Sequence, residues 1–527
     1  MTVFSGKPMT AASAVPERLS AATLWELLIA RAALSPDATM LIDGTRGVKM
    51  SFAQAHHIAE RLAAGLQTTG IGKGSRVTWQ LPTGIVAVMT ALALARLGAV
   101  QSPVISLYGA KELGAVLQGS NCEYLLIGAE ADAITRAQDA MLPLCQPPRV
   151  IPLSGELPQA HPSTLAPYES DHGIARWVYY TSGTTSQPKG ALHTDRSLML
   201  GGENLALAMA VDHHDVGSVA FPFAHIGGAM YTAMLLMTGM SAVLLERFQP
   251  AEAAAVFARH GVTTTGGSTA HYEALLTEQQ RTPGDPLIPS LRLLCGGGAF
   301  CPPALHQRVA SELGCTLLHN YGMTEIPLIC AGSTSDDQNA LAHSCGAPVS
   351  GIELRVVDAA GRTVHEQEGE VRVRGPAVFQ GYSDPALNEQ AFDDEGFFRT
   401  GDLGRLRADG RLVLTGRLKD VIIRKGENVS ALELEEILYR HPKVGAVAVI
   451  GLPDPQRGER VCAVVEPADG QAALTFDEMV ALFLSAKIMV QKIPEQLEII
   501  DRMPRNETLK KILKHELRAR FSTEPAV

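Results

Sequence analysis

Apolar and polar positions over most of the chain alternate between helical patterns and short apolar runs. Residues 85–97 (IVAVMTALALARL) predict a buried helix, and residues 99–105 (AVQSPVI) predict the strand that follows it. This alternation favours a layered α/β architecture, and no regular repeat indicates a solenoid or a propeller. The proline-rich segment 146–169 is typical of a surface connector.

A different pattern begins towards the C-terminus. Residues 397–419 predict short strands, and the Asp409-Gly410 dipeptide within them is of the kind that closes a β-hairpin. The next elements are those of a small α+β domain, namely a strand from Asp420, a helix over 431–440, strands over 444–450 and 461–465, and then helices. We therefore predict an N-terminal domain over residues 1–418 and a C-terminal domain over residues 419–527.

The composition of the 527 residues is that of a large, mildly acidic globular protein. Hydrophobic residues make up 46% and the formal net charge is -10, so the chain offers no basic stripe for nucleic acid. The eight cysteines include no CxxC pair, which favours neither a zinc site nor a disulfide framework. The N-terminus has no continuous apolar segment of signal-peptide type, and we expect a cytoplasmic location.

One segment invites comparison with a membrane span. Residues 216–245 contain no Asp, Glu, Lys or Arg. Pro222, His225 and several glycines interrupt the segment, which suits a strand, a loop and a buried helix beside a ligand site better than lipid. We expect no integral membrane segment.

An aromatic strand over residues 177–180 runs into a loop rich in glycine and hydroxyl groups, 181–190 (TSGTTSQPKG). Glycines let backbone N–H groups converge on an anion, hydroxyls add donors, and Lys189 adds positive charge, so the loop is suited to phosphate. It is not a Walker A loop, because Pro188 precedes the lysine and Gly190 stands where Ser or Thr would bind magnesium. In isolation, such a composition is also typical of a surface turn.

The whole segment 180–193 (YTSGTTSQPKGALH) resembles the signature of the superfamily of acyl-CoA synthetases, peptide-synthetase adenylation domains and beetle luciferases. The resemblance extends over nearly the whole chain. It implies an adenylate-forming enzyme fold: a large N-terminal α/β domain of layered sheets and helices with a small β-subdomain, and a small mobile α+β C-terminal domain. The residues that it implies for the triphosphate of ATP are Thr181, Ser182, Gly183, Thr184, Thr185 and Lys189, with Thr184 also on Mg²⁺. Ser186 departs from the family, which usually has glycine there.

Two further motifs follow in the family's order. Residues 296–299 (GGGA) are similar to the adenine-side glycine turn, and residues 320–325 (NYGMTE) resemble the aromatic-Gly-x-Thr-Glu motif. In that motif the tyrosine stacks on adenine, the threonine contacts the α-phosphate and the glutamate holds magnesium. The residues so implied are Gly297, Gly298, Ala299, Asn320, Tyr321, Gly322, Thr324 and Glu325. Taken singly, they are more typical of a turn, a buried tyrosine and a helix cap than of a nucleotide site.

The resemblance also assigns residues near the domain boundary. Asp402 and Arg417 are similar to the family's ribose clamp, although each is alternatively a surface ion-pair partner. Lys419 falls at the hinge about which the small domain swings. Gly426 and Glu427 lie in the loop that enters the pantetheine tunnel for transfer to coenzyme A.

Activation of a carboxylate at the α-phosphate requires a cation, because negative charge accumulates on the phosphoryl oxygens. The family supplies it from a Pro-x-x-x-x-Gly-Lys loop, which residues 503–514 (MPRNETLKKILK) resemble with Leu509 in the glycine position. Counting from Pro504 selects Lys510, whereas alignment of the terminal helix selects Lys511, which we favour. An exposed lysine pair at a helix end is the alternative.

Residues 221–228 (FPFAHIGG) resemble the family segment that borders the acyl pocket. His225 is a candidate for gating this pocket or orienting the carboxylate, with a satisfied core histidine as the alternative. The segment has no acidic residue to hold the ammonium group of an amino acid. Its apolar surroundings favour a medium-chain, alicyclic or aryl acid, and comprise Met230, Tyr231, Gly267 and Gly297.

These features together predict an AMP-forming acyl-CoA ligase, an acid–thiol ligase that uses ATP, Mg²⁺ and coenzyme A. One alternative is an acyl-adenylate ligase that loads a carrier protein. Another is a non-catalytic nucleotide- or acyl-binding relative, which the altered lysine loop motivates. The expected partners are small molecules, and a homodimer is one option for the assembly.

Overall fold

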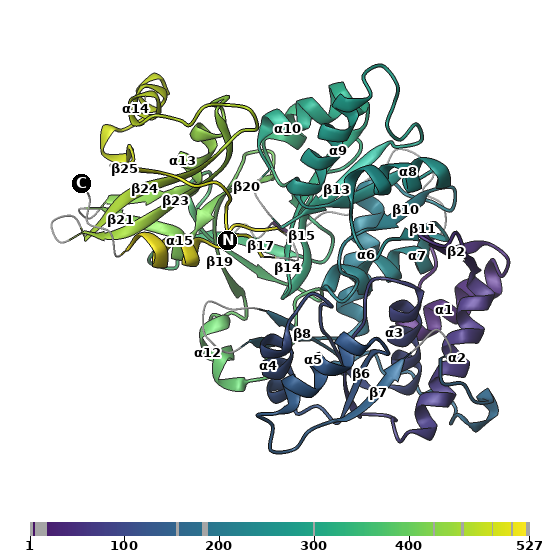
Figure 1. Cartoon of the computed structure of the whole chain (residues 1–527). Coiled ribbons are helices and arrows are strands. Elements are labelled where there is room, and N and C mark those ends of the chain that lie inside the picture. The colour runs from purple at the N-terminus through teal and green to yellow at the C-terminus, as the bar shows by residue number, and fades with distance from the viewer. Residues whose placement is uncertain are drawn as a thin grey trace. The chain divides into compact units, whose positions relative to one another are not determined.

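A computed structural model describes residues 4–5, 18–153, 157–181, 188–298, 301–424, 427–454, 458–486, 488–506 and 510–522 (Figure 1). The chain divides into two compact units. The first comprises residues 1–353 and 373–398, and the second comprises residues 354–372 and 399–527. This division assigns residues 399–418 to the second unit. The boundary expected at Lys419 stays a prediction.

The first unit contains a six-stranded sheet that carries the candidate phosphate loop. Its strand order is β7-β6-β4-β5-β8-β9, parallel except for the antiparallel pair of β8 and β9. The strands are β4 (Arg76–Gln80), β5 (Val100–Pro103), β6 (Tyr124–Gly128), β7 (Arg149–Leu153), β8 (Trp177–Thr181) and β9 (Lys189–His193). The helices of this region are α1 (Leu24–Leu34), α2 (Phe52–Thr68), α3 (Ile85–Leu97), α4 (Ala110–Ser120) and α5 (Ala131–Met141).

Helix α3 has the limits that the apolar pattern predicts. Its alanine, leucine and methionine side chains favour helix and are almost all buried, and Gly98 ends it in a left-handed conformation at φ 65°. The expected connector over 146–169 is wrong at residues 149–153, which form β7. Strand pairing with β6 outweighs the local proline content there.

Two further sheets complete the first unit. One has the order β10-β11-β2-β3, and the other has the order β12-β13-β14-β15-β16. Their strands are β2 (Thr39–Asp43), β3 (Lys49–Ser51), β10 (Val216–Val219), β11 (Ser241–Leu244), β12 (Thr264–Gly267), β13 (Leu293–Gly297), β14 (Thr316–Met323), β15 (Ile326–Ala331) and β16 (Ala347–Pro348). The accompanying helices are α6 (Asp195–Met209), α7 (Ile226–Thr238), α8 (Pro250–His260), α9 (Thr269–Arg281), α10 (Pro303–Arg308), α11 (Gln338–Ala342) and α12 (Asn388–Ala391).

The uncharged segment 216–245 forms strand β10, a loop, helix α7 and strand β11. The prediction of a strand, a loop and a buried helix is therefore confirmed. Within the part of the chain that the structure describes, no helix is both long and apolar enough to cross a bilayer.

The second unit contains a β-hairpin region and an α+β region. Strands β17 (Glu353–Val357), β18 (Gly369–Arg374), β19 (Phe398–Leu406) and β20 (Leu412–Arg417) are neighbours in that order, and β19 and β20 form the expected antiparallel hairpin. The sheet beyond it has the order β22-β21-β24-β23, and β25 also pairs with β24. Its elements are β21 (Val421–Arg424), β22 (Glu427–Ser430), β23 (Val444–Asp454), β24 (Gly458–Pro467), β25 (Gln496–Ile499), α13 (Ala431–Leu438), α14 (Phe476–Ser485) and α15 (Lys514–Phe521).

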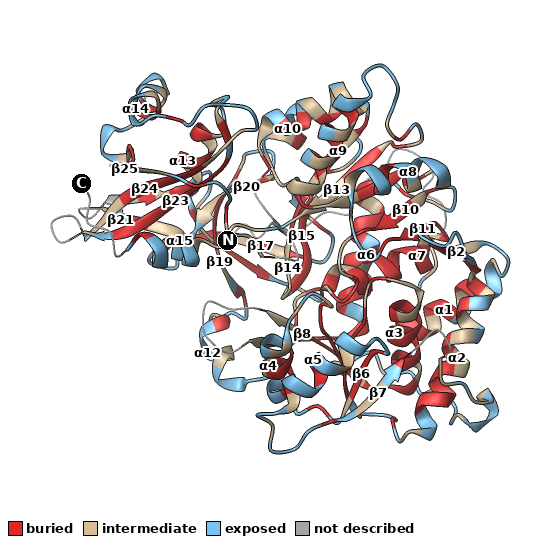
Figure 2. Ribbon diagram, viewed as in Figure 1, coloured by how far each residue is buried: buried red, intermediate tan, exposed pale blue. Residues whose placement is uncertain are grey.

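The sequence pattern missed β25, because its four residues are mostly half-buried and lack a strong apolar alternation. Helix α13 and strands β23 and β24 lie where the pattern expects them. Buried residues follow the sheets and the inner faces of the helices in each unit (Figure 2). The residues at the ends of the strands are thus held in place by well-packed sheets and helices.

Candidate active site

The candidate phosphate loop joins two paired strands. Strand β8 ends at Thr181, β9 begins at Lys189, and these two residues are Cα partners across the antiparallel pair. The predicted phosphate ligands Ser182, Gly183, Thr184 and Thr185 lie outside the described residues. Strand pairing therefore holds the two ends of the loop together, with a lysine at one of them.

The last residue of β9 ties this hairpin to the Thr324-Glu325 motif. His193 is buried, its Nε2 lies 2.8 Å from the Thr324 carbonyl oxygen, and its Nδ1 lies 2.9 Å from Ser197 Oγ. Burial lowers the pKa of His193 to about 4, so the imidazole is neutral and Nε2–H donates to the carbonyl. His193 belongs to the signature segment, but the sequence suggests no role for it.

A tyrosine from a distant segment contacts both charged residues of this site. The hydroxyl of Tyr382 donates to Glu325 Oε1 at 2.7 Å, and Lys189 Nζ lies 5.4 Å from the centroid of the Tyr382 ring. The N–H of Phe379, in the same segment, donates to the carbonyl oxygen of Glu325 at 2.9 Å. Sequence reasoning missed Tyr382, because only the fold brings residue 382 to residues 189 and 325.

Three glycines at the end of β13 allow close backbone packing. A Cβ on Gly297 would lie 2.3 Å from the Asn320 carbonyl oxygen, and a Cβ on Gly296 would lie 1.9 Å from the Gly267 carbonyl oxygen. Gly298 has φ 84°, a left-handed conformation that favours glycine. Ala299 lies outside the described residues. A side chain at Gly296 or Gly297 is thus sterically excluded.

Asn320 presents a buried acceptor beside this turn. Its Nδ2 donates to Cys295 Sγ at 3.1 Å, whereas Oδ1 is buried with no hydrogen-bond partner among the residues that the structure describes. An unpaired buried acceptor costs about 1–3 kcal/mol, which a ligand N–H would offset. Tyr321 follows it on β14 and is 6% exposed, and Gly322 comes next.

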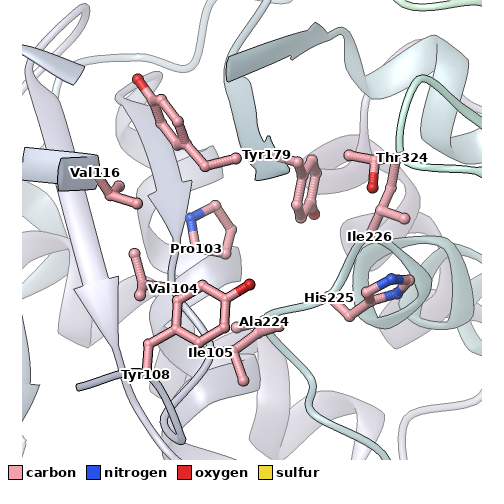
Figure 3. A pocket seen from close by; sticks show the side chains of 11 residues that line it. Pro103, Val104, Ile105, Tyr108, Val116, Tyr179, Ala224, His225, Ile226 and Thr324 are labelled. Atoms are coloured by element: carbon pink, nitrogen blue, oxygen red, sulfur yellow. The ribbon is translucent and has the colours of Figure 1, made fainter. Parts of the chain in front are cut away.

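A pocket in the first unit reaches Thr324 and His225 (Figure 3). The pocket is partly open to solvent. His225 also caps helix α7, because its Nδ1 accepts the N–H of Gly227 at 3.2 Å. The remaining walls are mostly apolar or aromatic, and are formed by Pro103, Val104, Ile105, Tyr108, Val116, Tyr179, Tyr180, Ala224 and Ile226.

In the second unit, the β19–β20 hairpin brings the predicted ribose ligands together. Asp402 and Arg417 are Cα partners, and Arg417 Nε lies 2.9 Å from Asp402 Oδ1. The Asp402 side chain is only 5% exposed, whereas that of Arg417 is 46% exposed. The ion pair fixes the carboxylate and leaves part of the guanidinium accessible.

The two candidate lysines of the C-terminal loop differ in environment. Lys510 is exposed and has φ 54°, an unusual left-handed conformation for a residue with a side chain. Lys511 is partly buried, and its N–H donates to Asn506 Oδ1 at 2.8 Å. Burial and then the charge of Arg417 lower the pKa of Lys511 to about 8, against the opposing effect of Asp402. Arg417 and Asp402 are therefore part of the electrostatic surroundings of Lys511.

The remaining predicted residues lie around strand β21. Lys419 is in the 3₁₀ turn Leu418–Asp420, and burial lowers its pKa. Glu427 begins β22, but its side chain lies outside the described residues, as does the whole of Gly426.

Comparison with known families decides the class of the protein. The model of the AMP-binding enzyme family matches residues 28–383, and that of the AMP-binding enzyme C-terminal domain matches residues 433–510. The chain belongs to the AMP-binding enzyme family. The expected resemblance, the adenylate-forming fold and the enzyme class, an AMP-forming acid–thiol ligase, are thereby confirmed.

Members of the AMP-binding family resemble this chain over almost its full length. The medium-chain fatty-acid–CoA ligase of Escherichia coli (strain K12) is 32% identical over 504 residues, which cover 92% of this chain and 88% of that protein. The feruloyl-CoA synthase of Amycolatopsis sp is 33% identical over 501 residues, 94% of this chain and 98% of that protein. The crystal structure of ATP-bound MatB from Rhodopseudomonas palustris matches with a TM-score of 0.84 at 26% identity, covering 96% of this chain and 99% of MatB.

Proposed function

We propose that this AMP-binding enzyme activates an apolar carboxylic acid with ATP as an acyl-adenylate and transfers the acyl group to coenzyme A, releasing AMP and pyrophosphate. The observation that carries the proposal is the junction between two parts of the first unit. One is the antiparallel pair of strands β8 and β9, here called the phosphate hairpin, and the other is the Thr324-Glu325 motif. His193 and Tyr382 link the two parts by hydrogen bonds, so a cation and a carboxylate are held around one site.

The roles proposed for the nucleotide-binding residues follow from their hydrogen-bond donors and acceptors. The loop from Thr181 to Lys189 surrounds the phosphates with backbone N–H groups, hydroxyls and one ammonium. Asn320 Oδ1 accepts the exocyclic amine of adenine, which supplies the missing donor. Asp402 accepts the ribose hydroxyls while Arg417 fixes its carboxylate.

A divalent cation fits Glu325. The carboxylate is half-buried, Tyr382 engages Oε1, and Oε2 has no partner among the described residues, which leaves a hard oxygen ligand of the type that Mg²⁺ prefers. When bound there with Thr184, Mg²⁺ would neutralise phosphate charge. The chain's own contribution is to hold the carboxylate in position through Tyr382 and to leave Oε2 available to the cation.

We assign the activating cation to Lys511. The family loop has glycine before its lysine, and Lys510 has the positive φ that this position favours. Lys511 thus takes the next position, where it is partly buried near Arg417. Its ammonium stabilises the charge that accumulates while the substrate carboxylate oxygen bonds to the α-phosphorus and pyrophosphate leaves.

In the second half-reaction, the thiol of coenzyme A attacks the acyl carbonyl carbon of the adenylate, and AMP leaves. We propose that rotation at Lys419 brings Gly426 and Glu427 towards the pantetheine path. These assignments rest on the family pattern. A cytoplasmic location and a homodimer remain predictions of the same kind.

The proposed acid is of medium chain length, alicyclic or aryl. The pocket beside His225 is walled mainly by apolar and aromatic side chains, and residues 216–245 supply no carboxylate for an amino-acid ammonium group. Relatives named for medium-chain fatty acids and for ferulate support this class. We propose that His225 orients the substrate carboxylate, because its ring lines this pocket.

A panel of carboxylic acids, scored for AMP release with and without coenzyme A, tests the function. We expect AMP release that depends on both an apolar acid and coenzyme A. Acid-dependent ATP–pyrophosphate exchange without coenzyme-A-dependent turnover would favour loading of a carrier protein instead. Nucleotide binding with no AMP release on any acid would favour a non-catalytic relative and contradict the proposal.

A further inference from the structure

We propose that Tyr382 is a positioning residue that keeps Lys189 and Glu325 apart and orients the Glu325 carboxylate for a divalent cation. The inference rests on the proposed function, in which Lys189 faces the phosphates and Glu325 binds Mg²⁺. Tyr382 lies in a third part of the chain, outside both signature motifs, 180–193 and 320–325.

The backbone around Tyr382 is fixed against the phosphate hairpin. The N–H of Leu192 donates to the Gly381 carbonyl oxygen at 3.0 Å, and that of Gln380 donates back to Leu192 at 2.8 Å. The N–H of Ser383 donates to the Gly190 carbonyl oxygen at 2.8 Å. The segment is thus hydrogen-bonded along β9, and its position is set by the same strand that begins with Lys189.

The tyrosine side chain is held as firmly as its backbone. Asn388 Oδ1 accepts the N–H of Tyr382 at 2.8 Å, and the Tyr382 ring packs edge-on against Phe379 at a centroid distance of 4.9 Å. Tyr382 is 8% exposed. The hydroxyl therefore reaches Glu325 from a fixed direction, which is the requirement for orienting a metal ligand.

The hydroxyl of Tyr382 is a hydrogen-bond donor to the Glu325 carboxylate. It donates to Glu325 Oε1 at 2.7 Å, a charge-assisted hydrogen bond. The carboxylate cannot rotate freely while this bond is made, and its second oxygen keeps a constant direction.

The aromatic ring separates two opposite charges. Lys189 Nζ lies 5.4 Å from the ring centroid, and among the residues that the structure describes Lys189 and Glu325 form no ion pair with each other. A direct ion pair would neutralise both groups and withdraw them from phosphate and metal. Tyr382 instead offers its ring face to the ammonium and its hydroxyl to the carboxylate.

The test uses the full-length chain and calorimetric binding of α,β-methylene-ATP, with Mg²⁺ and with EDTA. Tyr382→Phe removes the hydroxyl and keeps the ring. We expect it to reduce the gain in affinity that Mg²⁺ confers by about ten-fold, while affinity in EDTA stays unchanged. Tyr168→Phe is the matched control, because it removes a tyrosine hydroxyl bonded to Thr23 Oγ1 at 2.9 Å, and it should change neither value.

A double-mutant cycle separates positioning from general destabilisation. If Tyr382 acts through Glu325, then Tyr382→Phe combined with Glu325→Gln should lose no more of the Mg²⁺-dependent gain than Glu325→Gln alone. Additive losses, or a full Mg²⁺-dependent gain in Tyr382→Phe, would overturn the inference. A wild-type chain that gains no affinity from Mg²⁺ would instead contradict the proposed metal role of Glu325.

Discussion

The backbone conformation at Lys510 gives two neighbouring lysines, Lys510 and Lys511, different environments. Lys510 and Lys511 are chemically identical, yet the first is exposed in a left-handed conformation and the second is partly buried beside Arg417. A left-handed residue projects its side chain away from the path of its neighbours, and the position suits glycine. Conformation therefore supports Lys511 as the proposed activating lysine, and burial lowers its pKa.

The role proposed for Lys511 predicts how acyl-adenylate formation depends on pH. The ordinary lysine pKa lies above 10, and burial lowers the pKa of Lys511 to about 8, so the ammonium is lost as the pH rises through this value. We expect kcat/KM for ATP in acid-dependent ATP–pyrophosphate exchange to fall above about pH 8, because kcat/KM reports the free enzyme.

Three variants check the assignment of this titration. Lys511→Arg should move the alkaline fall to higher pH, because a guanidinium keeps its proton, and Lys511→Ala should slow exchange by about 100-fold or more. Lys510→Ala should keep the wild-type profile. A normal rate in Lys511→Ala, or loss of the profile in Lys510→Ala, would reverse the assignment.

At the scale of elements, the end of helix α7 depends on a side chain from α1. Arg31 is buried, and it donates through Nε to the Leu236 carbonyl oxygen at 2.7 Å and through Nη2 to the Met237 carbonyl oxygen at 2.6 Å. These carbonyls are among the last of α7 and lack partners within the helix. The guanidinium thus holds the C-terminal end of the helix that His225 caps at its N-terminus.

Arg31→Met should destabilise the first unit by about 2–4 kcal/mol, because it leaves buried carbonyls without their charged donors. Thermal unfolding of the full-length protein would measure the change. Arg46→Met, at an exposed turn, is the control and should unfold like the wild type. Exchange activity of folded Arg31→Met at low temperature should persist. Equal unfolding temperatures for the two variants would contradict this role of Arg31.

At the scale of the whole molecule, the two half-reactions place different demands on one chain. The Asp402–Arg417 ion pair and Lys511 belong to one compact unit, and strands β8 and β9 and Glu325 belong to the other. Lys419 lies in the short 3₁₀ turn Leu418–Asp420, directly before the strand that leads to residues 426 and 427. A turn of this kind can absorb a change of φ and ψ.

Lys419→Pro should therefore separate the two half-reactions. Proline fixes φ near −65°, a value within the general 3₁₀ range, and so resists rotation. We expect ATP–pyrophosphate exchange within about two-fold of the wild type, and thioester formation from supplied acyl-adenylate slower by about ten-fold or more. Lys419→Ala, which keeps the freedom of φ, should retain both. Equal losses in both half-reactions would argue against a hinge at this residue.

The sequence by itself determined the local features of this protein. Helix α3, the β19–β20 hairpin and the succession of the signature motifs were predictable, because apolar periodicity, turn residues and short glycine-rich segments record local conformation and burial. The family and the fold class followed from these motifs. The short strands β7 and β25 did not, because their stability comes from neighbouring strands.

Only the tertiary structure decided which distant residues meet. The sequence gives no indication that Tyr382 contacts Glu325 and Lys189, or that His193 holds the Thr324 carbonyl oxygen. The unpaired oxygen of Asn320 likewise exists only once the strands around it are packed. Such contacts depend on strand order and burial across nearly two hundred residues, whereas a sequence motif extends over a few neighbours along the chain.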